Sequence, residues 1–180
     1  MPKMKWSDLR PMQLGRYAEY YAKMEFASYG YDIYTSEVDD HGVDFVASKN
    51  SGIYYEIQVK SLLKGNYAFI PDKLMDCNDS KRLVCFLKFV DGRLPDVYVI
   101  PATAWQNLNE ALLYRKYDKP GQSNKKEWGI SCANKNLPLL EKYRAEKYLE
   151  QLFKENGIPY ALNKKSKVVR AMEAYRASNK

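Results

Sequence analysis

The run Glu56-Ile57-Gln58-Val59-Lys60 carries the residue types best suited to chemistry in this sequence. Side chains alternate between the two faces of a β-strand, so a strand here places Glu56, Gln58 and Lys60 on one face. Three polar side chains on one face of a central strand need a reason beyond packing. A carboxylate, an amide oxygen and an ammonium group in a row can bind a cation and a phosphate together.

A second acidic residue precedes this run. Asp44 lies among Val43, Phe45 and Val46, and a lone carboxylate in an apolar strand is costly to bury unless it is paired or binds a metal. A hairpin of the two strands would bring Asp44 to the end of the second strand that carries Gln58 and Lys60. Glu19, on a helix before both strands, is the third candidate, and Glu25 on the same helix competes with it.

Oxygen ligands from two carboxylates and an amide suit Mg²⁺ or Mn²⁺. We therefore expect a metal site of Asp44, Gln58 and Glu19, with Glu56 as an alternative ligand. Such a metal polarises a phosphate and lowers the pKa of a bound water. Lys60 would orient that water and stabilise the charge that grows on the phosphate. The set predicts a site for phosphodiester hydrolysis.

The first elements that would position these residues are a helix and a β-hairpin. Apolar residues recur every three or four positions over residues 12–29, which predicts a helix, and Gly30 is typical of its end. The period then changes to that of strands. The predicted strands are 31–36, 43–48 and 53–62, with polar turns at 38–42 and 49–52.

The second half alternates strand and helix patterns. The predicted strands are 83–90, 96–100 and 127–132, the predicted helices are 101–114 and 137–155, and a polar loop covers 114–126. A helix, a run of strands and then further helices predict an α/β fold with a mixed sheet. We expect one domain over residues 1–162, followed by a basic, helical tail over residues 163–180.

The strand residues resemble a known group. Gly42-Val43-Asp44 followed by Gln58-Val59-Lys60-Ser61, after a helix that contains Gly15-Arg16-Tyr17-Ala18-Glu19, is similar to the PD-(D/E)xK nuclease superfamily. The nearest likeness is to its DUF4365-type and Holliday-junction-resolvase-like members. The resemblance covers about residues 12–62.

The resemblance implies a restriction-endonuclease-like α/β/α sandwich with a central mixed sheet, a divalent metal and DNA cleavage. It gives Glu19, Asp44 and Gln58 the metal-facing places and Lys60 the place of the catalytic lysine. Gln58 departs from the commoner Asp or Glu, and a neutral ligand weakens metal binding. Two functions therefore stay open, a metal-dependent deoxyribonuclease and a weak or inactive nuclease fold that binds nucleic acid or serves a partner enzyme.

Charge is unevenly spread along the 180 residues. The net charge is +7, and residues 121–180 carry 13 basic and 6 acidic groups, whereas residues 1–60 carry 7 and 9. A basic face holds polyanions through phosphate contacts, so we expect DNA as the partner. The predicted nucleic-acid contacts in the tail are Lys164, Lys165, Lys167 and Arg170.

Composition excludes several other classes. Three scattered cysteines argue against a disulfide framework and for a reducing cytoplasm, and the single histidine, His41, excludes a mechanism that needs two. His41 also has no Ser or Cys partner in a hydrolase motif. We see no signal peptide or membrane span, and we expect a homodimer by analogy with nucleases of this size.

Overall fold

The computed structural model describes residues 3–35, 42–49, 52–118 and 125–155. The chain divides into two compact units, Met1–Leu149 and Glu150–Lys180, and the fold that follows is that of the first. The predicted tail over residues 163–180 and the predicted boundary at residue 162 lie outside the described residues and stay predictions.

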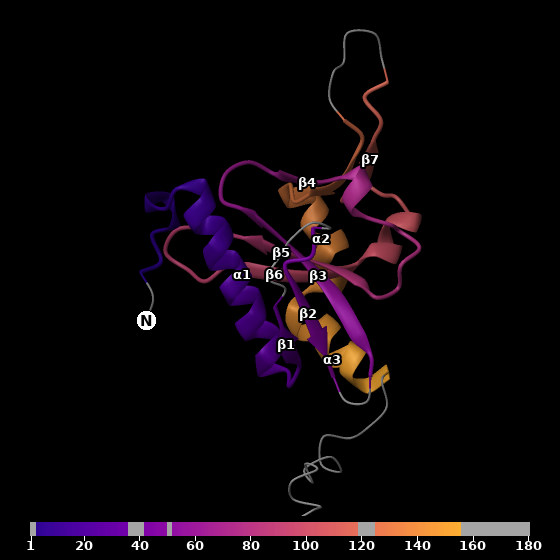
Figure 1. Cartoon of the computed structure of the whole chain (residues 1–180). Coiled ribbons are helices and arrows are strands. Elements are labelled where there is room, and N and C mark those ends of the chain that lie inside the picture. Colours follow the sequence, from indigo (N-terminus) through magenta and orange to yellow (C-terminus); the bar gives the residue numbers. More distant parts are fainter. Residues whose placement is uncertain (1–2, 36–41, 50–51, 119–124, 156–180) are drawn as a thin grey trace, which may run out of the picture. The chain divides into compact units, whose positions relative to one another are not determined.

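A five-stranded central sheet forms the middle of the fold (Figure 1). Its strands, in spatial order, are β1 (Asp32–Tyr34), β2 (Phe45–Ser48), β3 (Tyr54–Leu62), β5 (Arg82–Lys88) and β6 (Asp96–Pro101). β3 pairs in parallel with β5, and the other neighbours are antiparallel. The sheet is therefore mixed, and the predicted α/β fold class with a central mixed sheet is confirmed.

Helix α1 (Pro11–Ser28) covers one face of this sheet. It buries residues four apart, Leu14, Ala18, Ala22 and Phe26. The Phe26 ring packs edge-on against Phe45 of β2, with 5.5 Å between centroids. This face is the one that the odd-numbered residues of β2 and β3 share, because side chains alternate along a strand. The helix and the β2–β3 hairpin are confirmed.

A three-stranded small sheet lies against the other face. Its spatial order is β4 (Tyr67–Pro71), β8 (Glu127–Ser131) and β7 (Leu112–Arg115), all antiparallel. Ala68, Ile70 and Ile130 of the small sheet share one apolar core with Val84 and Phe86 of β5. The sequence analysis did not predict β4 or this second sheet.

The predicted helix over residues 101–114 is wrong. The chain forms only a short 3-10 helix, η3 (Ala102–Gln106), and then enters strand β7. The Oδ1 of Asn109 accepts the backbone N–H groups of Ala111 (2.8 Å) and Leu112 (3.0 Å), which turns the chain out of helical geometry. Leu108, which lies within the predicted helix, is 53% exposed.

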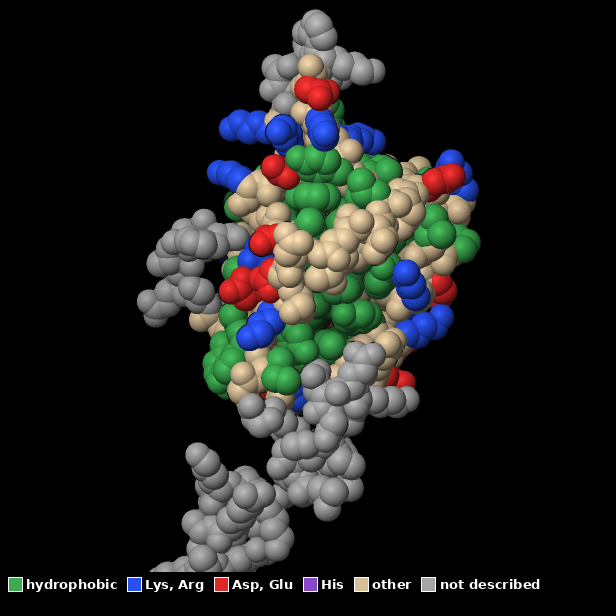
Figure 2. All heavy atoms as spheres, turned by 90° about the vertical axis from the view of Figure 1, so that its right-hand side faces the viewer, with side chains coloured by type: hydrophobic (Ala, Val, Ile, Leu, Met, Phe, Trp, Pro, Cys, Tyr) green, Lys and Arg blue, Asp and Glu red, His purple; other side chains and the backbone are tan. Residues whose placement is uncertain are grey.

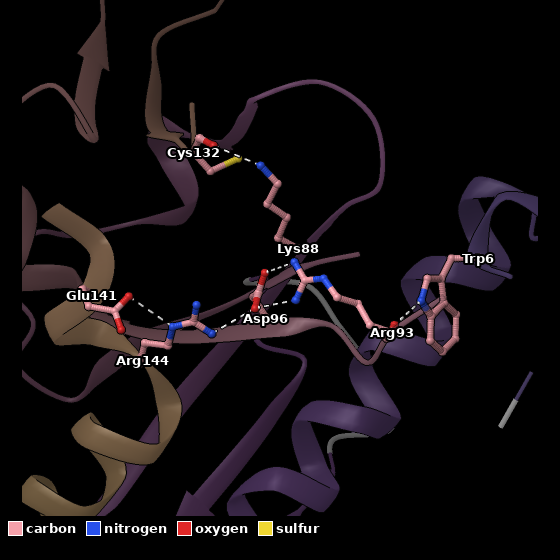
Figure 3. Close-up of polar contacts among 7 residues, drawn as sticks. All are labelled: Trp6, Lys88, Arg93, Asp96, Cys132, Glu141 and Arg144. Atoms are coloured by element: carbon pink, nitrogen blue, oxygen red, sulfur yellow. Dashed lines mark hydrogen bonds and ion pairs between the residues drawn. The ribbon is translucent and has the colours of Figure 1, made fainter. Parts of the chain in front are cut away.

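The predicted single helix over residues 137–155 is interrupted. The segment comprises α2 (Leu137–Leu140), η5 (Glu141–Tyr143) and α3 (Ala145–Glu155). Arg144 breaks it because its backbone is extended, at φ −51° and ψ 135°, and forms an isolated bridge with Tyr98 of β6. Its guanidinium group binds Asp96 at 2.9 Å (Figure 3). A tertiary contact therefore overrides the helical pattern.

Three further 3-10 segments complete the described unit: η1 (Trp6–Asp8), η2 (Asp72–Leu74) and η4 (Asn134–Asn136). Trp6 of η1 is buried and donates its indole N–H to the Arg93 carbonyl at 2.8 Å (Figure 3). Among the described residues, no helix is long and apolar enough to cross a membrane.

Two glycines should respond in opposite ways to replacement by alanine. A Cβ on Gly129 of β8 would overlap the Tyr67 ring, with Cζ at 2.7 Å, whereas no atom of the described residues lies within 4 Å of a Cβ on Gly15 of α1. Gly129→Ala should destabilise the fold by about 1–3 kcal/mol through overpacking. Gly15→Ala should stabilise it by up to about 1 kcal/mol, because glycine is a poor helix former. Urea denaturation of the two variants measures both, and equal effects would contradict the described packing.

Asp96 should make stability depend on acid pH. Hydrogen bonds from Arg93 and Arg144 lower the pKa of its carboxyl group (Figure 3). The ionised form therefore stabilises the fold above the unfolded-state pKa of about 4, and this stability is lost as pH falls through the lower folded-state pKa. Asp96→Asn should lower Tm at pH 7, and the difference from wild type should shrink below pH 4. A difference independent of pH would contradict the ion pairs.

Candidate active site

The β2–β3 hairpin holds Asp44 against the middle of β3. Asp44 lies directly before β2, and its backbone N–H donates to the Ile57 carbonyl at 2.9 Å. Its carboxylate Oδ2 accepts the backbone N–H of Val59 at 2.6 Å. Val59 stands between Gln58 and Lys60, so the structure brings Asp44 to the two residues with which the sequence grouped it.

Gln58 is buried on the face of the central sheet that meets the small sheet. It pairs with Val84 of β5 and is 2% exposed. Among the described residues, its Oε1 has no hydrogen-bond partner. An unsatisfied buried carbonyl oxygen costs about 1–3 kcal/mol, so this oxygen does not contribute to the stability of the fold.

Gly42 makes room for the Gln58 side chain. Its φ of +68° is in the left-handed region, and an added Cβ would lie 2.9 Å from Gln58 Nε2 and 3.3 Å from Leu74 Cδ1. Glycine therefore serves two needs here, the backbone turn and the close approach. The Gly-x-Asp spacing of residues 42–44 thus places the amide and the carboxylate of the site together.

Lys60 shares the face of Gln58. Lys60 lies two residues after Gln58 on β3 and pairs with Phe86 of β5, and its side chain is half-buried. Phe86 belongs to the apolar core between the two sheets. Asp44, Gln58 and Lys60 therefore form one group at the β2–β3 hairpin, and we refer to them as the hairpin triad.

An arginine that the sequence analysis missed borders this triad. Arg82, the first residue of β5, is buried, and its Nη1 binds Glu56 Oε2 at 2.8 Å. Its Nη2 donates to the carbonyls of Gly42 (3.0 Å) and Leu74 (3.1 Å). Glu56, the alternative metal ligand, is thus engaged in an ion pair. The sequence signal that could have identified Arg82 is its position as a basic residue directly before a continuous apolar strand.

The two helix glutamates lie in the layer on the opposite face of the central sheet. Glu19 accepts a hydrogen bond from Arg16 Nη1 at 2.6 Å, one turn earlier on α1. Burial raises the pKa of Glu25, with a smaller contribution from the nearby charge of Glu146. Burial also raises the pKa of the Cys85 thiol, with smaller contributions from Glu25 and Asp44. The structure gives Glu19 a partner outside the hairpin triad.

Within the described ranges, no group of three or more His, Cys, Asp and Glu side chains lies close enough to hold a metal. The donors that fit a hard cation are therefore one carboxylate, Asp44, and the amide oxygen of Gln58. Among the described residues, the Gln58 Oε1 has no hydrogen-bond partner, so it is an oxygen that could serve as a ligand. His41 and the tail residues Lys164, Lys165, Lys167 and Arg170 lie outside the described residues, and their roles stay predictions.

Comparison with solved structures gives a partial backbone likeness. No family model matches the chain, and no curated protein matches it. A structure of the Holliday junction resolvase Hjc from the archaeon Archaeoglobus fulgidus is similar over 69% of this chain and 88% of its own, with 16% identity and a TM-score of 0.45. A likeness this weak says nothing about activity, so the function of this chain has to be argued from its own residues. The DUF4365-type resemblance stays a prediction.

Two left-handed glycines test the packing around Gln58. Gly42 (φ +68°) and Gly52 (φ +92°) both strain any other residue, but only a Cβ at position 42 meets Gln58. Gly52→Ala should cost about 1–2 kcal/mol of backbone strain, and Gly42→Ala should cost more. Gly42→Ala alone should shift the NMR signals of the Gln58 side-chain amide. Equal stabilities and unchanged amide signals would contradict the contact.

Proposed function

We propose that the chain is a metal-dependent deoxyribonuclease that hydrolyses DNA phosphodiester bonds with Mg²⁺ or Mn²⁺. The observation that carries the proposal is the buried Gln58 Oε1, which has no hydrogen-bond partner among the described residues. It lies near Asp44, whose carboxylate accepts the backbone N–H of Val59, and two residues before Lys60. We include the predicted homodimer, because two copies of one site are needed to cut both strands of a duplex together.

Each residue of the hairpin triad has a distinct role in this proposal. Asp44 and Gln58 would hold the cation, which supplies Lewis acidity toward a phosphate oxygen when bound. Lys60 would place its ammonium group beside the scissile phosphate, orient the attacking water and stabilise the growing negative charge. The Val59 N–H fixes Asp44 through the 2.6 Å hydrogen bond, so the carboxylate is oriented before substrate binds.

Two predicted ligands receive smaller roles. Glu19 is left out of the proposed metal site because α1 packs against the opposite face of the central sheet. Glu56 serves to neutralise buried Arg82, which in turn binds the Gly42 carbonyl. We assign both residues to positioning and stability rather than to cation binding.

A second candidate function is a nuclease-fold protein that binds nucleic acid but cleaves it weakly or not at all. Gln58 favours it, because a neutral oxygen in place of a carboxylate reduces the affinity for hard divalent cations. The described residues also lack a cluster of three acidic or other typical ligands. A cleavage assay on plasmid, branched and single-stranded DNA with Mg²⁺ and with Mn²⁺ separates the two candidates.

Lys60→Ala and Asp44→Ala should each reduce metal-dependent DNA cleavage by roughly 100-fold or more while the protein stays folded, because each removes a contact to the reacting phosphate or the cation. Lys64→Ala is the matched control, since Lys64 is exposed and four residues further along the chain. It should cleave at the wild-type rate. Wild-type cleavage by both triad variants would remove the site assignment.

Gln58→Glu should tighten Mn²⁺ binding in the absence of DNA, because a nearly isosteric carboxylate adds charge to the cation site. Glu56→Gln should leave Mn²⁺ binding near the wild-type value. It should instead lower Tm, because it removes the ion pair that Glu56 makes with buried Arg82.

Calorimetric titration of Mn²⁺ and thermal denaturation of both variants measure these effects. If Glu56→Gln abolishes binding while Gln58→Glu changes nothing, Glu56 is the ligand and the role proposed for Gln58 is wrong.

A further inference from the structure

Basic side chains gather at the ends of β7 and β8, on the small sheet. Residues 112–118 and 125–131 hold four basic residues, all of them exposed: Arg115, Lys116, Lys125 and Lys126. We call these four the basic hairpin surface. Figure 2 shows Lys and Arg side chains crowded near the top of the view, above a patch of apolar side chains.

The acidic residues of the same two segments do little to offset this charge. They are Asp118, which is exposed, and Glu127, which is buried at 8% exposure. Glu127 Oε1 accepts hydrogen bonds from the hydroxyls of Tyr67 and Tyr117, both at 2.8 Å. Burial, followed by the bond to Glu127, raises the pKa of Tyr67, so this phenol stays a donor at neutral pH. The surface itself is left mainly cationic.

Aromatic side chains are interleaved with the cations on the outer face of the small sheet. Ala68 and Ile70 of β4 point into the core, so Tyr67 and Phe69 point away from it. The guanidinium carbon of Arg115 lies 3.9 Å from the Tyr67 ring centroid, which holds this cation in place. Phe69 is 52% exposed. Cations that follow a backbone beside an exposed ring are typical of surfaces that bind nucleic acid.

A short segment joins this surface to the hairpin triad. The backbone N–H of Asp72, which begins η2, donates to the Lys126 carbonyl at 3.0 Å. Leu74, which ends η2, accepts from Arg82 and packs beside Gly42 next to Gln58. One turn of 3-10 helix therefore separates the base of the basic hairpin surface from the candidate active site.

We propose that the basic hairpin surface binds the DNA phosphate backbone and directs it toward the hairpin triad, with Phe69 in contact with a base or sugar. This inference rests on the proposed function for the identity of the polyanion. It assigns to described residues a contact that the sequence analysis placed only in the tail.

The test is the salt dependence of DNA binding by the full chain. Fluorescence anisotropy would follow binding to labelled duplex, four-way-junction and single-stranded DNA over a range of NaCl concentrations, with EDTA present so that no cleavage occurs. The test variant replaces Lys116, Lys125 and Lys126 with Gln and keeps Arg115, whose stacking on Tyr67 supports the fold. The matched control replaces the exposed residues Lys135, Lys142 and Lys147 with Gln.

Each lost phosphate contact should lower the slope of log affinity against log salt by about 0.9 on duplex DNA. The test variant should therefore lose roughly 2–3 from the slope and bind about tenfold or more weakly. The control should stay within about twofold of wild type, because its three lysines lie outside the basic hairpin surface. Phe69→Ala should weaken binding without changing the slope. An unchanged slope in the test variant, or no DNA binding by the wild type, overturns the proposal.

Two further arms separate this proposal from the others. DNA binding that depends on the basic hairpin surface, with no cleavage by the wild type in Mg²⁺ or Mn²⁺, leaves this inference intact and removes the proposed catalysis. DNA cleavage that does not depend on the basic hairpin surface supports the proposed catalysis and overturns this inference. If the basic hairpin surface binds phosphatidylserine vesicles and not DNA, its partner is a membrane, and the proposal is overturned.

Discussion

One buried cation, the Arg82 guanidinium group, joins the three segments on which the candidate active site depends. It binds Glu56 of β3, the Gly42 carbonyl before β2 and the Leu74 carbonyl at the end of η2, at 2.8, 3.0 and 3.1 Å. The Arg82 side chain is 8% exposed, whereas that of Glu56 is 49% exposed, so only the arginine side of the ion pair is withdrawn from water. Gly42 touches Gln58 in turn. The position of the Gln58 amide therefore depends on the ion pair between Arg82 and Glu56, which lies two residues before Gln58 on β3.

The parts of the structure that the sequence predicts well are those set by short periods. α1 follows from apolar residues three and four apart, and the β2–β3 hairpin follows from alternation and turn residues. The same period of two places Gln58 and Lys60 on one face, and the hairpin register brings Asp44 beside them. The role of Glu56 could not be found in this way, because its partner Arg82 is 26 residues away and no local pattern links the two.

The elements that the sequence mispredicts are those decided by distant contacts. Residues 101–114 have apolar spacing that suits a helix, yet Leu112 pairs with Ile130 of β8 and Asn109 turns the chain before it. Residues 137–155 read as one amphipathic helix, and the bond from Arg144 to Asp96, 48 residues earlier, interrupts it. In both segments the free energy of a tertiary contact exceeds a helix preference of a few tenths of a kcal/mol per residue, roughly.

The pairing of β4 with β8 also determines when the fold can be completed. Tyr67 and Glu127, joined by a hydrogen bond, are 60 residues apart in the chain. The strands β3 and β5, which pair in parallel, are also separated in the sequence by β4. Such long-range pairings pay their loop-closure entropy before any contact compensates for it, and they form slowly. During synthesis, α1 and the β2–β3 hairpin can assemble before β8, the strand that pairs with β4, has been made. The small sheet can close only after its central strand, β8, has been made, and until then Ala68 and Ile70 of β4 lack Ile130, with which they share the apolar core.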